Sequence, residues 1–395
     1  MNRTLLHTPD GMRDVYGKEL ENLNQISEIL SKNNHLYGYE DISTPALEFL
    51  DVFSKDMGTI SSKELYQFFD REGNTLCLRP DFTPAIARCA AKYYMEEDLP
   101  LRFSYDGNAF VNNVELQGKL KETRQLGVEL INDPSIDADV EVISLVIEGL
   151  LKLGLKDFQI SLGNSDYFRG ICKAANFDEE TENVIKDYIL SKNYFALLDY
   201  VKNQNLDVNV IKNIESISKL FMSDKDLEVL KEKSTHPLSV AAIDRLLDIK
   251  KILEKKGYDK YISFDLSMIS KHYYYTGVIL KCYTYGVGDA IVKGGRYNEL
   301  IGKFGKEAPA IGCVFLVDEI MNALNRQNIE LPSKKREFKT LLVYTEDKYE
   351  QAMAKADSMR ADGISVTCMR TDSDISLTAC ELYAKKNNFN SVVNA

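Results

Sequence analysis

The chain has 395 residues and a net charge of −11, with 60 acidic and 49 basic side chains. This length allows about two or three domains around a buried main core. The acidic balance argues against a general polyanion binder, whose affinity would come from neutralising phosphates.

Neither a membrane nor a secreted location is indicated. No run approaches the roughly 20 apolar residues of a membrane-spanning helix, and the N-terminus lacks the apolar segment of a signal peptide. The seven cysteines are scattered singly, without CxxC pairs, so we expect neither a metal site nor a disulfide framework. Together these features favour a cytoplasmic protein.

The first third of the chain predicts a sheet with a covering helix. Residues 9–34 pass from a turn into an amphipathic helix. Its apolar positions are Leu20, Leu23, Ile26, Ile29 and Leu30. Strand, turn and helix signals follow in 39–53 and 64–94, with Gly73 and Asn74 placed to turn a hairpin. Two more strands are expected in 100–111 and 121–132, and neighbouring hairpins imply mostly antiparallel pairing.

From about residue 166 to 258 the pattern is almost entirely helical, which predicts a helical insertion in a sheet domain. Strand signals return at Tyr261. A connector over 326–336 then leads to a unit at 337–395, where strand and helix patterns alternate as a small βαβαβ unit. The expected domains are therefore 1–325, containing the insertion, and 337–395.

The stretch "SKHYYYTG" at 270–277 lies between two strand-like segments, 261–269 and 278–285. Taken alone, it favours a β-hairpin edge with tyrosines alternating across two faces. Other stretches of the chain point to a different use for these tyrosines.

Four segments in order resemble motifs of the histidyl-tRNA synthetase family, which has the class II synthetase-like fold. They are "LRPDFTPAIAR" at 78–88, "RQLGVEL" at 124–130, "YYTG" at 274–277 and "GGRYNELIGKFG" at 294–305. The segment "TPALEF", with Pro45 and Glu48, resembles the dimer-forming first motif. The resemblance implies an α+β fold: an antiparallel sheet flanked by helices, followed by a truncated relative of an anticodon-binding domain.

The arginines that the family uses to hold ATP are missing from the matching positions. Adenylate formation needs fixed guanidinium groups at the reacting phosphate. The positions of the second-motif arginine and glutamate hold Val111 and Asn113, the histidine-loop arginine falls on Ser270, and the third arginine falls on Glu319. Losing one such donor typically costs a hundredfold to a thousandfold in rate, about a few kcal/mol. We therefore expect no synthetase chemistry, no catalytic residue and no cofactor.

Much of the family's amino-acid pocket persists. By the resemblance, Asp81, Thr83 and Gln125 lie where the family holds the α-amino group of histidine. Glu129 and Tyr274 lie where it recognises the imidazole, with Tyr275 beside them. A carboxylate and a phenol suit the two ring nitrogens as acceptor and donor.

Two departures affect the ligand's charged ends. Asp81 is one methylene shorter than the family's glutamate, so its reach to the ammonium differs. Ser270 removes the family's partner for the ligand carboxylate, which leaves Lys271, Arg124 or a group from another subunit. Lys121, Arg124 and Lys271 are also the cations near the missing ATP-binding arginines, but a flexible ammonium does not reproduce a bidentate guanidinium.

Several of these residues also have structural interpretations. Thr83 could cap the helix that begins near Pro84, Arg79 could form a structural ion pair, and Gly294 and Gly295 could serve a tight turn. For the two glycines and the following Arg296 we favour the structural interpretation.

A synthetase-like chain with a histidine pocket and without the ATP clamp is similar to the regulatory subunit of ATP phosphoribosyltransferase. The segment "YDGNAF" at 105–110 is closer to that paralogue than to the true synthetase. In that family the subunit assembles with a short catalytic subunit, activates the first step of histidine biosynthesis and conveys feedback inhibition by histidine. The resemblance thus implies a hetero-oligomer, with histidine as effector and a homodimeric core.

Two alternatives remain open. A divergent histidyl-tRNA synthetase would exchange pyrophosphate into ATP with histidine, and a structural or RNA-binding scaffold would bind no amino acid. Against RNA contact, residues 337–395 hold seven Lys or Arg and nine Asp or Glu, without the basic stripe that an RNA reader needs.

Overall fold

The computed structural model of the chain describes residues 6–53, 61–113, 119–204, 206–219, 222–269, 274–332, 338–371 and 377–395. It divides into two compact units, Met1–Leu331 and Pro332–Ala395. Among the described residues, no helix combines the length and apolar character that crossing a membrane requires.

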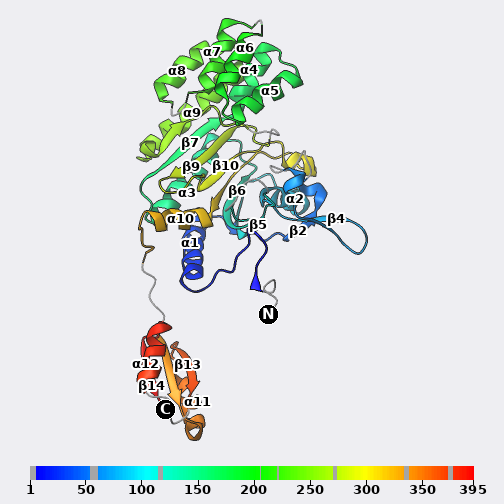
Figure 1. The fold of residues 1–395 in the computed structure, drawn as a ribbon. Helices are drawn as coiled ribbons and strands as arrows, with labels where there is room; N and C mark the ends of the chain where they lie inside the picture. Colours follow the sequence, from blue (N-terminus) through cyan, green and yellow to red (C-terminus); the bar gives the residue numbers. More distant parts are fainter. Residues whose placement is uncertain are drawn as a thin grey trace. The chain divides into compact units, whose positions relative to one another are not determined.

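The centre of the larger unit is a sheet of eight strands (Figure 1). Its order across the sheet is β1 (Glu40–Asp41), β5 (Leu101–Phe110), β6 (Glu122–Ile131), β11 (Ala310–Leu316), β10 (Val292–Arg296), β9 (Val278–Thr284), β7 (Phe158–Asn164), β8 (Ile262–Phe264). The pairs β1 with β5 and β7 with β8 are parallel, and the other neighbours are antiparallel. The mostly antiparallel sheet predicted from the sequence is confirmed.

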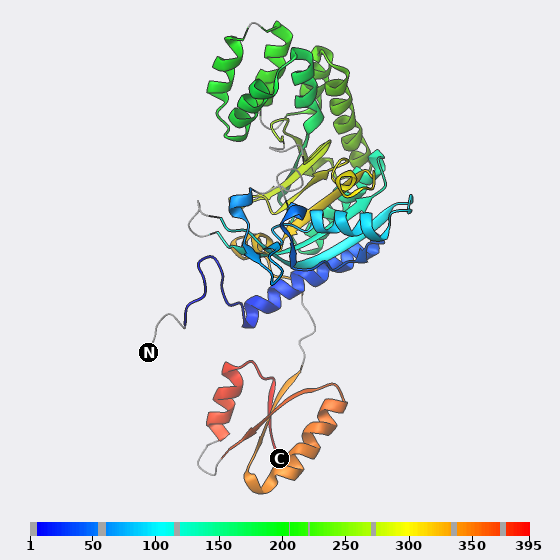
Figure 2. The ribbon, with the colours of Figure 1, turned by 90° about the vertical axis from the view of Figure 1, so that its right-hand side faces the viewer.

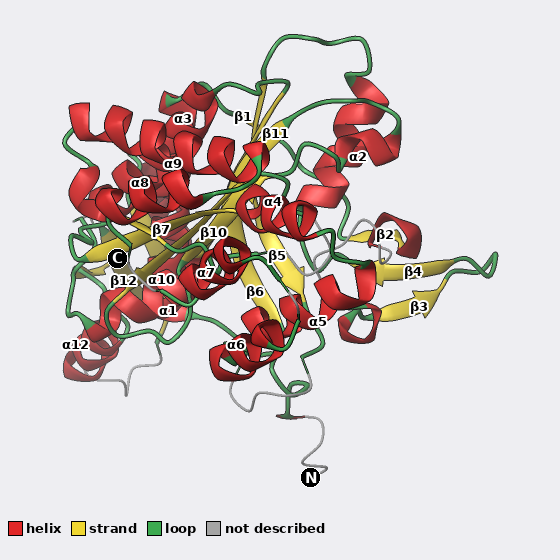
Figure 3. Cartoon of the chain, turned by 90° about the horizontal axis from the view of Figure 1, so that it is seen from above, coloured by secondary structure: helices red, strands yellow, loops and turns green. Residues whose placement is uncertain are grey.

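The two faces of this sheet are covered differently. One face packs on α1 (Gly17–Leu36), α3 (Ile136–Lys152) and α10 (Val317–Arg326), and together they form the main hydrophobic core. The other face carries a smaller core with α2 (Thr83–Tyr93) and the 3-10 helix η5 (Ile301–Phe304). Seen from above, α2 lies on the opposite side of the sheet from α1 and α10 (Figure 3). We call the α2 side the open face.

The helical insertion predicted for about 166–258 is present. It consists of α4 (Ser165–Ala175), α5 (Glu179–Leu190), α6 (Tyr194–Lys202), α7 (Val208–Ile217), α8 (Asp224–Lys233) and α9 (Pro237–Lys255). These helices gather at one end of the sheet (Figure 2), and α9 packs on β7 and α3. Helix α4 directly follows β7, so the insertion is joined to the sheet through its first helix along the chain and through the packing of its last helix.

A small sheet next to α2 contains β2 (Leu47–Phe49), β4 (Thr75–Leu78) and β3 (Gln67–Phe69) in that order. The turn between β3 and β4 is held by Asp70, whose carboxylate accepts hydrogen bonds from the backbone N–H groups of Glu72 and Asn74. The hairpin predicted at Gly73 and Asn74 is confirmed.

The smaller unit is a three-stranded parallel sheet in the order β13 (Ser365–Arg370), β12 (Lys339–Tyr344), β14 (Ser391–Asn394). Its helices are α11 (Tyr349–Ala361) and α12 (Leu377–Lys386). Strand and helix alternate along the chain as βαβαβ, as predicted. Part of the expected linker, residues 333–336, and the first residue of the expected second domain, Glu337, lie outside the described residues.

The hairpin interpretation of the tyrosine run was wrong. The strands on either side of it, β8 and β9, do not pair with each other, because β7 lies between them. Residues 274–277 form an irregular segment that enters β9, while Tyr273 lies outside the described residues. Tyr274 and Tyr275 therefore do not belong to a hairpin and can contribute to a site on the face of the sheet.

Candidate functional site

The open face of the sheet presents a row of side chains from β6. Glu129 stands opposite Phe103 of β5 and Gly312 of β11. Because strand side chains alternate between faces, Gln125 and Glu129 point to the open face. Leu126, Val128 and Leu130 point into the main core on the other face.

The carboxylate of Glu129 is buried, with 1% of the residue exposed. The hydroxyl of Thr83 donates to its Oε1 at 2.6 Å, and the hydroxyl of Tyr297 donates to its Oε2. Burial raises the pKa of Glu129 to about 8; the two hydroxyl donors lower it and the charge of Asp81 raises it further. At neutral pH, therefore, this site favours a neutral acid until a positive charge arrives.

Among the described residues, no cation compensates Glu129: none forms an ion pair with it or contributes to its pKa. A buried carboxylate without a cation is costly, and such perturbed groups concentrate at functional sites. A ligand that brings a positive charge or strong hydrogen-bond donors would offset this cost.

Aromatic rings close the site around Glu129. The ring of Tyr274 meets the ring of Tyr275 edge to face, with centroids 4.9 Å apart, and stacks on Tyr297 at 5.9 Å. Burial raises the pKa of Tyr274 and of Tyr275 far above the usual range, so both stay neutral phenols. They present donors and acceptors without adding charge.

Two glycines make room for these side chains. A Cβ at Gly312 would lie 1.8 Å from Oε2 of Glu129, and a Cβ at Gly295 would lie 2.7 Å from Cδ1 of Tyr275. Only glycine at these two positions lets the carboxylate and the phenol ring approach the backbone this closely.

The structure thus brings Thr83, Glu129, Tyr274 and Tyr275 together. Asp81 lies beside them, because its Oδ1 accepts from the backbone N–H of Thr83 at 3.1 Å. Gln125 is half-buried on the same face, four residues along β6 from Glu129. The direct Thr83 to Glu129 hydrogen bond joins two residues that the sequence assigned to opposite ends of the ligand.

Tyr297 is the site residue that sequence reasoning missed. It follows β10 directly, inside the segment "GGRY" that was singled out for its glycines and arginine. It is 2% exposed. The available signal was strand alternation, which puts Tyr297 on the same face as Gly295, two residues before it.

The structural interpretations of two residues are corrected. Thr83 is the first residue of α2, with Phe82 at the N-cap, and its hydroxyl serves Glu129 instead of capping the helix. Arg79 binds backbone carbonyl oxygens of Thr44 at 2.7 Å and Asn108 at 2.9 Å and lies 3.9 Å above the ring of Phe82. Arg79 therefore has a structural role: it binds two backbone carbonyl oxygens and stacks on an aromatic ring, and it forms no ion pair among the described residues.

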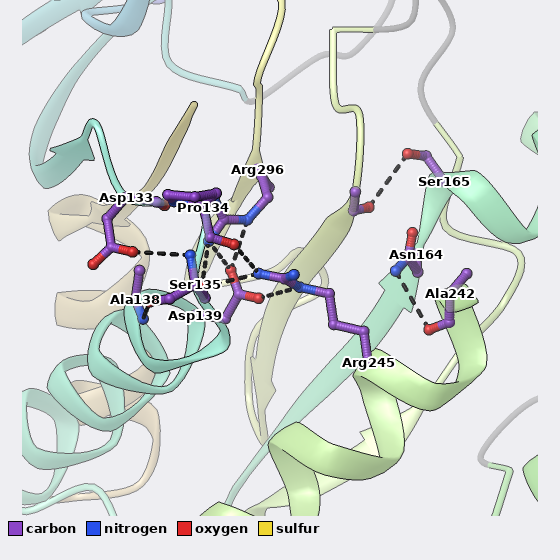
Figure 4. Close-up of polar contacts among 11 residues, drawn as sticks. Asp133, Pro134, Ser135, Ala138, Asp139, Asn164, Ser165, Ala242, Arg245 and Arg296 are labelled. Carbon is purple, nitrogen blue, oxygen red and sulfur yellow. Dashed lines mark hydrogen bonds and ion pairs between the residues drawn. The ribbon is translucent and has the colours of Figure 1, made fainter. Parts of the chain in front are cut away.

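Gly294 and Gly295 lie within β10 and form no turn, so that interpretation was wrong. The structural interpretation of Arg296 is supported. Its guanidinium donates to Oδ1 of the fully buried Asp139 at 2.6 and 2.9 Å, and Arg245 of α9 donates to the second oxygen, Oδ2, at 2.6 Å. Figure 4 shows both guanidinium groups pointing at Asp139 from different elements.

This cluster also fixes the segment that carries the tyrosines. The carbonyl oxygen of Arg296 accepts from the backbone N–H of Thr276, and the carbonyl of Gly277 accepts from the N–H and the hydroxyl of Ser165 at the start of α4. The pocket segment is thereby bonded to both ends of the insertion, at Ser165 and, through Arg296 and Asp139, at Arg245.

Arg124 does not reach the pocket. It lies next to Gln125 on β6 and so points to the opposite face, where its guanidinium binds Asp106 at 2.9 and 2.7 Å and Asn24 at 2.7 Å. It was wrongly proposed as a partner of the ligand carboxylate. Lys121 donates to Asn112 at 3.0 Å, while Ser270 and Lys271 lie outside the described residues.

The other positions of the ATP clamp hold no basic side chain. Val111 and Asn113 follow the end of β5, and Glu319 lies in the first turn of α10.

A family model described as histidyl-tRNA synthetase matches residues 11–320. A protein of Clostridium novyi named ATP phosphoribosyltransferase regulatory subunit is 38% identical over 367 residues, which are 92% of this chain and 86% of that protein. A protein of the same name from Bacillus thuringiensis subsp. konkukian is 35% identical over 98% of this chain and 91% of its own length.

Solved structures agree with these similarities. A Bacillus halodurans protein described as an ATP phosphoribosyltransferase regulatory subunit/histidyl-tRNA synthetase superposes with a TM-score of 0.86 at 28% identity, covering 99% of this chain and 98% of that chain. A histidyl-tRNA synthetase of Nostoc sp. PCC 7120 gives a TM-score of 0.78 at 19% identity, covering 98% and 91%, which supports the fold alone.

Proposed function

Because this chain belongs to the family of ATP phosphoribosyltransferase regulatory subunits, which share the class II fold of histidyl-tRNA synthetases, we propose that it activates a short catalytic subunit and transmits feedback inhibition by histidine. The complex would carry out the first step of histidine biosynthesis. All seven cysteines are free thiols, as suits the reducing cytoplasm in which we expect it to work.

The uncompensated carboxylate of Glu129 is the observation that carries the proposal. It accepts from the hydroxyls of Thr83 and Tyr297, and Tyr274, whose ring stacks on Tyr297, adds a phenol for an imidazole. Beside it, Asp81 offers a carboxylate to an ammonium. Histidine brings both partners: a cationic ammonium and a ring with one donor and one acceptor. A pocket that binds ring nitrogens discriminates against apolar analogues.

Inhibition follows by linkage. Histidine lowers the activity of the partner only if it binds the inactive conformation of the complex more tightly than the active one. A coupling of about 1 to 3 kcal/mol is enough. Residues 274–277 are bonded directly to Ser165 and, through Arg296 and Asp139, indirectly to Arg245. Such a change would reach the helical insertion through these contacts.

The test combines this chain with a short catalytic subunit and measures phosphoribosyl-ATP formation with and without histidine. We expect activation by the chain and inhibition by histidine. Glu129→Gln and Tyr274→Phe should weaken inhibition and spare complex formation. No activation and no inhibition in the wild-type complex would contradict the proposal, and loss of assembly in both variants would assign the two residues to structure.

The same material separates this function from aminoacylation. A synthetase would exchange pyrophosphate into ATP with histidine, whereas the positions held by Val111, Asn113 and Glu319 offer no guanidinium to the phosphates. We expect no exchange above background, measured beside an intact histidyl-tRNA synthetase. Exchange at a rate within about a hundredfold of that control would contradict the proposal.

We also propose a homodimeric core that uses the first-motif region. Strand β2 is an edge strand whose Leu47 and Phe49 are 47% and 56% exposed. Between them, Glu48 is buried and bound by Arg88 at 2.7 Å. An exposed apolar edge of this kind fits a symmetric partner. Sedimentation of Phe49→Glu should show monomers where the wild type shows dimers, and an unchanged sedimentation coefficient would exclude this surface.

A further inference from the structure

A second row of polar side chains crosses the open face next to the pocket. Lys293 of β10 stands opposite Lys281 of β9, Lys281 opposite Ser161 of β7, and Ser161 opposite Ser263 of β8. The hydroxyl oxygens of the two serines are 3.3 Å apart. Since Lys293 is two residues from Gly295 on the same strand, this row points to the same face as the pocket. We call these four residues the lysine row.

The two lysines form an unfavourable pair in the absence of a ligand. Like charges directly opposite each other on neighbouring strands destabilise a sheet. Lys281 is half-buried. Burial lowers the pKa of its ammonium, and the charge of Lys293 lowers it further. Among the described residues Lys281 forms no hydrogen bond or ion pair within 4 Å, so its positive charge has no direct partner there.

The neighbouring charges leave the row positive. Lys293 lies 3.2 Å from Asp289, and that carboxylate is also 3.6 Å from Lys119. Asp265 and, from the insertion, Lys192 also act on Lys281. Four lysines thus face two aspartates, in a chain whose net charge is −11. A local positive region in an acidic protein marks a place where an anion would bind.

The lysine row is separate from the amino-acid pocket. Lys293 lies two strands and Lys281 three strands away from the strand of Glu129, which at about 4.8 Å per strand are lateral offsets of about 10 and 14 Å. A single amino acid bound at Glu129 would not span the offset to Lys281. The row is therefore suited to a second ligand or to a larger one.

We propose that the lysine row binds a multiply charged phosphate group, such as the pyrophosphate or phosphate ester of a small metabolite. Two adjacent ammonium groups match the charge of a phosphate dianion, and the hydroxyls add neutral donors beside it. A carboxylate would need only one of the two lysines. The chain would then sense a phosphorylated metabolite through a site that does not depend on the proposed histidine pocket.

The experiment titrates inorganic pyrophosphate, and separately histidine, into the full chain by calorimetry at fixed ionic strength. The variants are Lys281→Gln and Lys293→Gln. The matched control is Lys225→Gln, which removes the same charge from an exposed position on α8. We expect pyrophosphate to bind the wild type and the control alike, and each row variant to bind about tenfold more weakly or worse. Histidine affinity should stay within about twofold in all three.

Other results would overturn the inference. No pyrophosphate binding by the wild type excludes the site, and an equal loss in the Lys225 control shows only general charge attraction. If Lys281→Gln abolishes histidine binding and leaves pyrophosphate binding unchanged, the lysines belong to the amino-acid pocket. Because the histidine titration is a separate arm, failure of this inference leaves the proposed function intact.

Discussion

Two buried carboxylates in the same unit, Glu129 and Asp139, have opposite electrostatic surroundings. Asp139 is fully buried and held by the guanidinium groups of Arg296 and Arg245. Glu129 is equally buried and, among the described residues, receives hydrogen bonds from two hydroxyls and from no cation. A charge that the fold itself neutralises serves the architecture, whereas a charge that the fold leaves uncompensated is available to a ligand.

The contrast extends to what each carboxylate positions. Asp139 joins α3, β10 and α9, so it connects the sheet with the helical insertion. Glu129 of β6 accepts from α2 and from the residue after β10, beside the stacked rings of Tyr274 and Tyr297. The following changes test whether this division between a structural and a ligand-binding carboxylate holds, beginning with the largest expected effect.

Arg296→Met should cost the most stability. It leaves Asp139 with one guanidinium in a fully buried place, and breaking a buried pair typically costs about 3–5 kcal/mol. Urea unfolding measures the loss, with Arg71→Met at the exposed tip of the β3 to β4 hairpin as a control expected to be near neutral. A loss below about 1 kcal/mol would mean that Asp139 does not need both cations.

Gly312→Ala should disturb the other carboxylate. The new Cβ would lie 1.8 Å from Oε2 of Glu129, so the side chain must move, at a cost of about 1–3 kcal/mol. Histidine affinity should fall with it. Gly288→Ala is the matched control, since a Cβ there meets nothing within 4 Å. Equal behaviour of the two variants in unfolding and in histidine binding would refute the close approach.

Glu129→Gln should stabilise the chain increasingly as pH rises. The pKa of Glu129 in the fold, about 8, lies above its ordinary value of 4.5. Its contribution to stability is therefore complete below pH 4.5 and is lost as pH rises through 8. Glutamine resembles the neutral acid at every pH. From pH 5 to pH 8.5 we expect the variant to gain on the order of 4 kcal/mol relative to wild type in urea unfolding.

The exposed Glu254→Gln provides the comparison for this pH series. Its difference from wild type should not change with pH. If Glu129→Gln also shows a constant difference, Glu129 is ionised at little cost, and the contrast with Asp139 disappears.

Arg124→Gln should have the smallest effect. Its ion pair with Asp106 is partly exposed and lies on the opposite face from the pocket, so the change should cost no more than about 1 kcal/mol of stability. Histidine affinity should stay within about twofold. A tenfold loss in a calorimetric titration would return Arg124 to the list of residues that hold the ligand carboxylate.

The fold could be predicted from the sequence where local signals are strong. The Gly73 and Asn74 turn, the helical periodicity of the insertion and the βαβαβ pattern of the smaller unit all depend on neighbouring residues. The prediction of a hairpin at the tyrosine run was wrong because it depended only on the two flanking strand patterns. Which strand lies between β8 and β9 depends on β7, more than 90 residues earlier, and no local signal carries that information.

The site could be predicted only as a set of residue types. The resemblance selected Thr83 and Glu129, and the structure places both beside the tyrosines. It did not predict the hydrogen bond between them, because contact between α2 and β6 depends on the tertiary fold. Tyr297 was not predicted, because the glycines before it have a structural interpretation that accounts for the segment without the tyrosine. The sequence could have excluded Arg124 as a partner of the ligand carboxylate. Arg124 directly precedes Gln125 on a strand, and strand alternation already assigns the two side chains to opposite faces.

A calorimetric titration of the purified chain with L-histidine, repeated with Glu129→Gln, tests most directly whether the uncompensated carboxylate serves a ligand. We expect one site per chain in the wild type and an affinity about tenfold lower or worse in the variant, with far-UV circular dichroism unchanged. No binding by the wild type, or the same affinity in both proteins, would contradict the account.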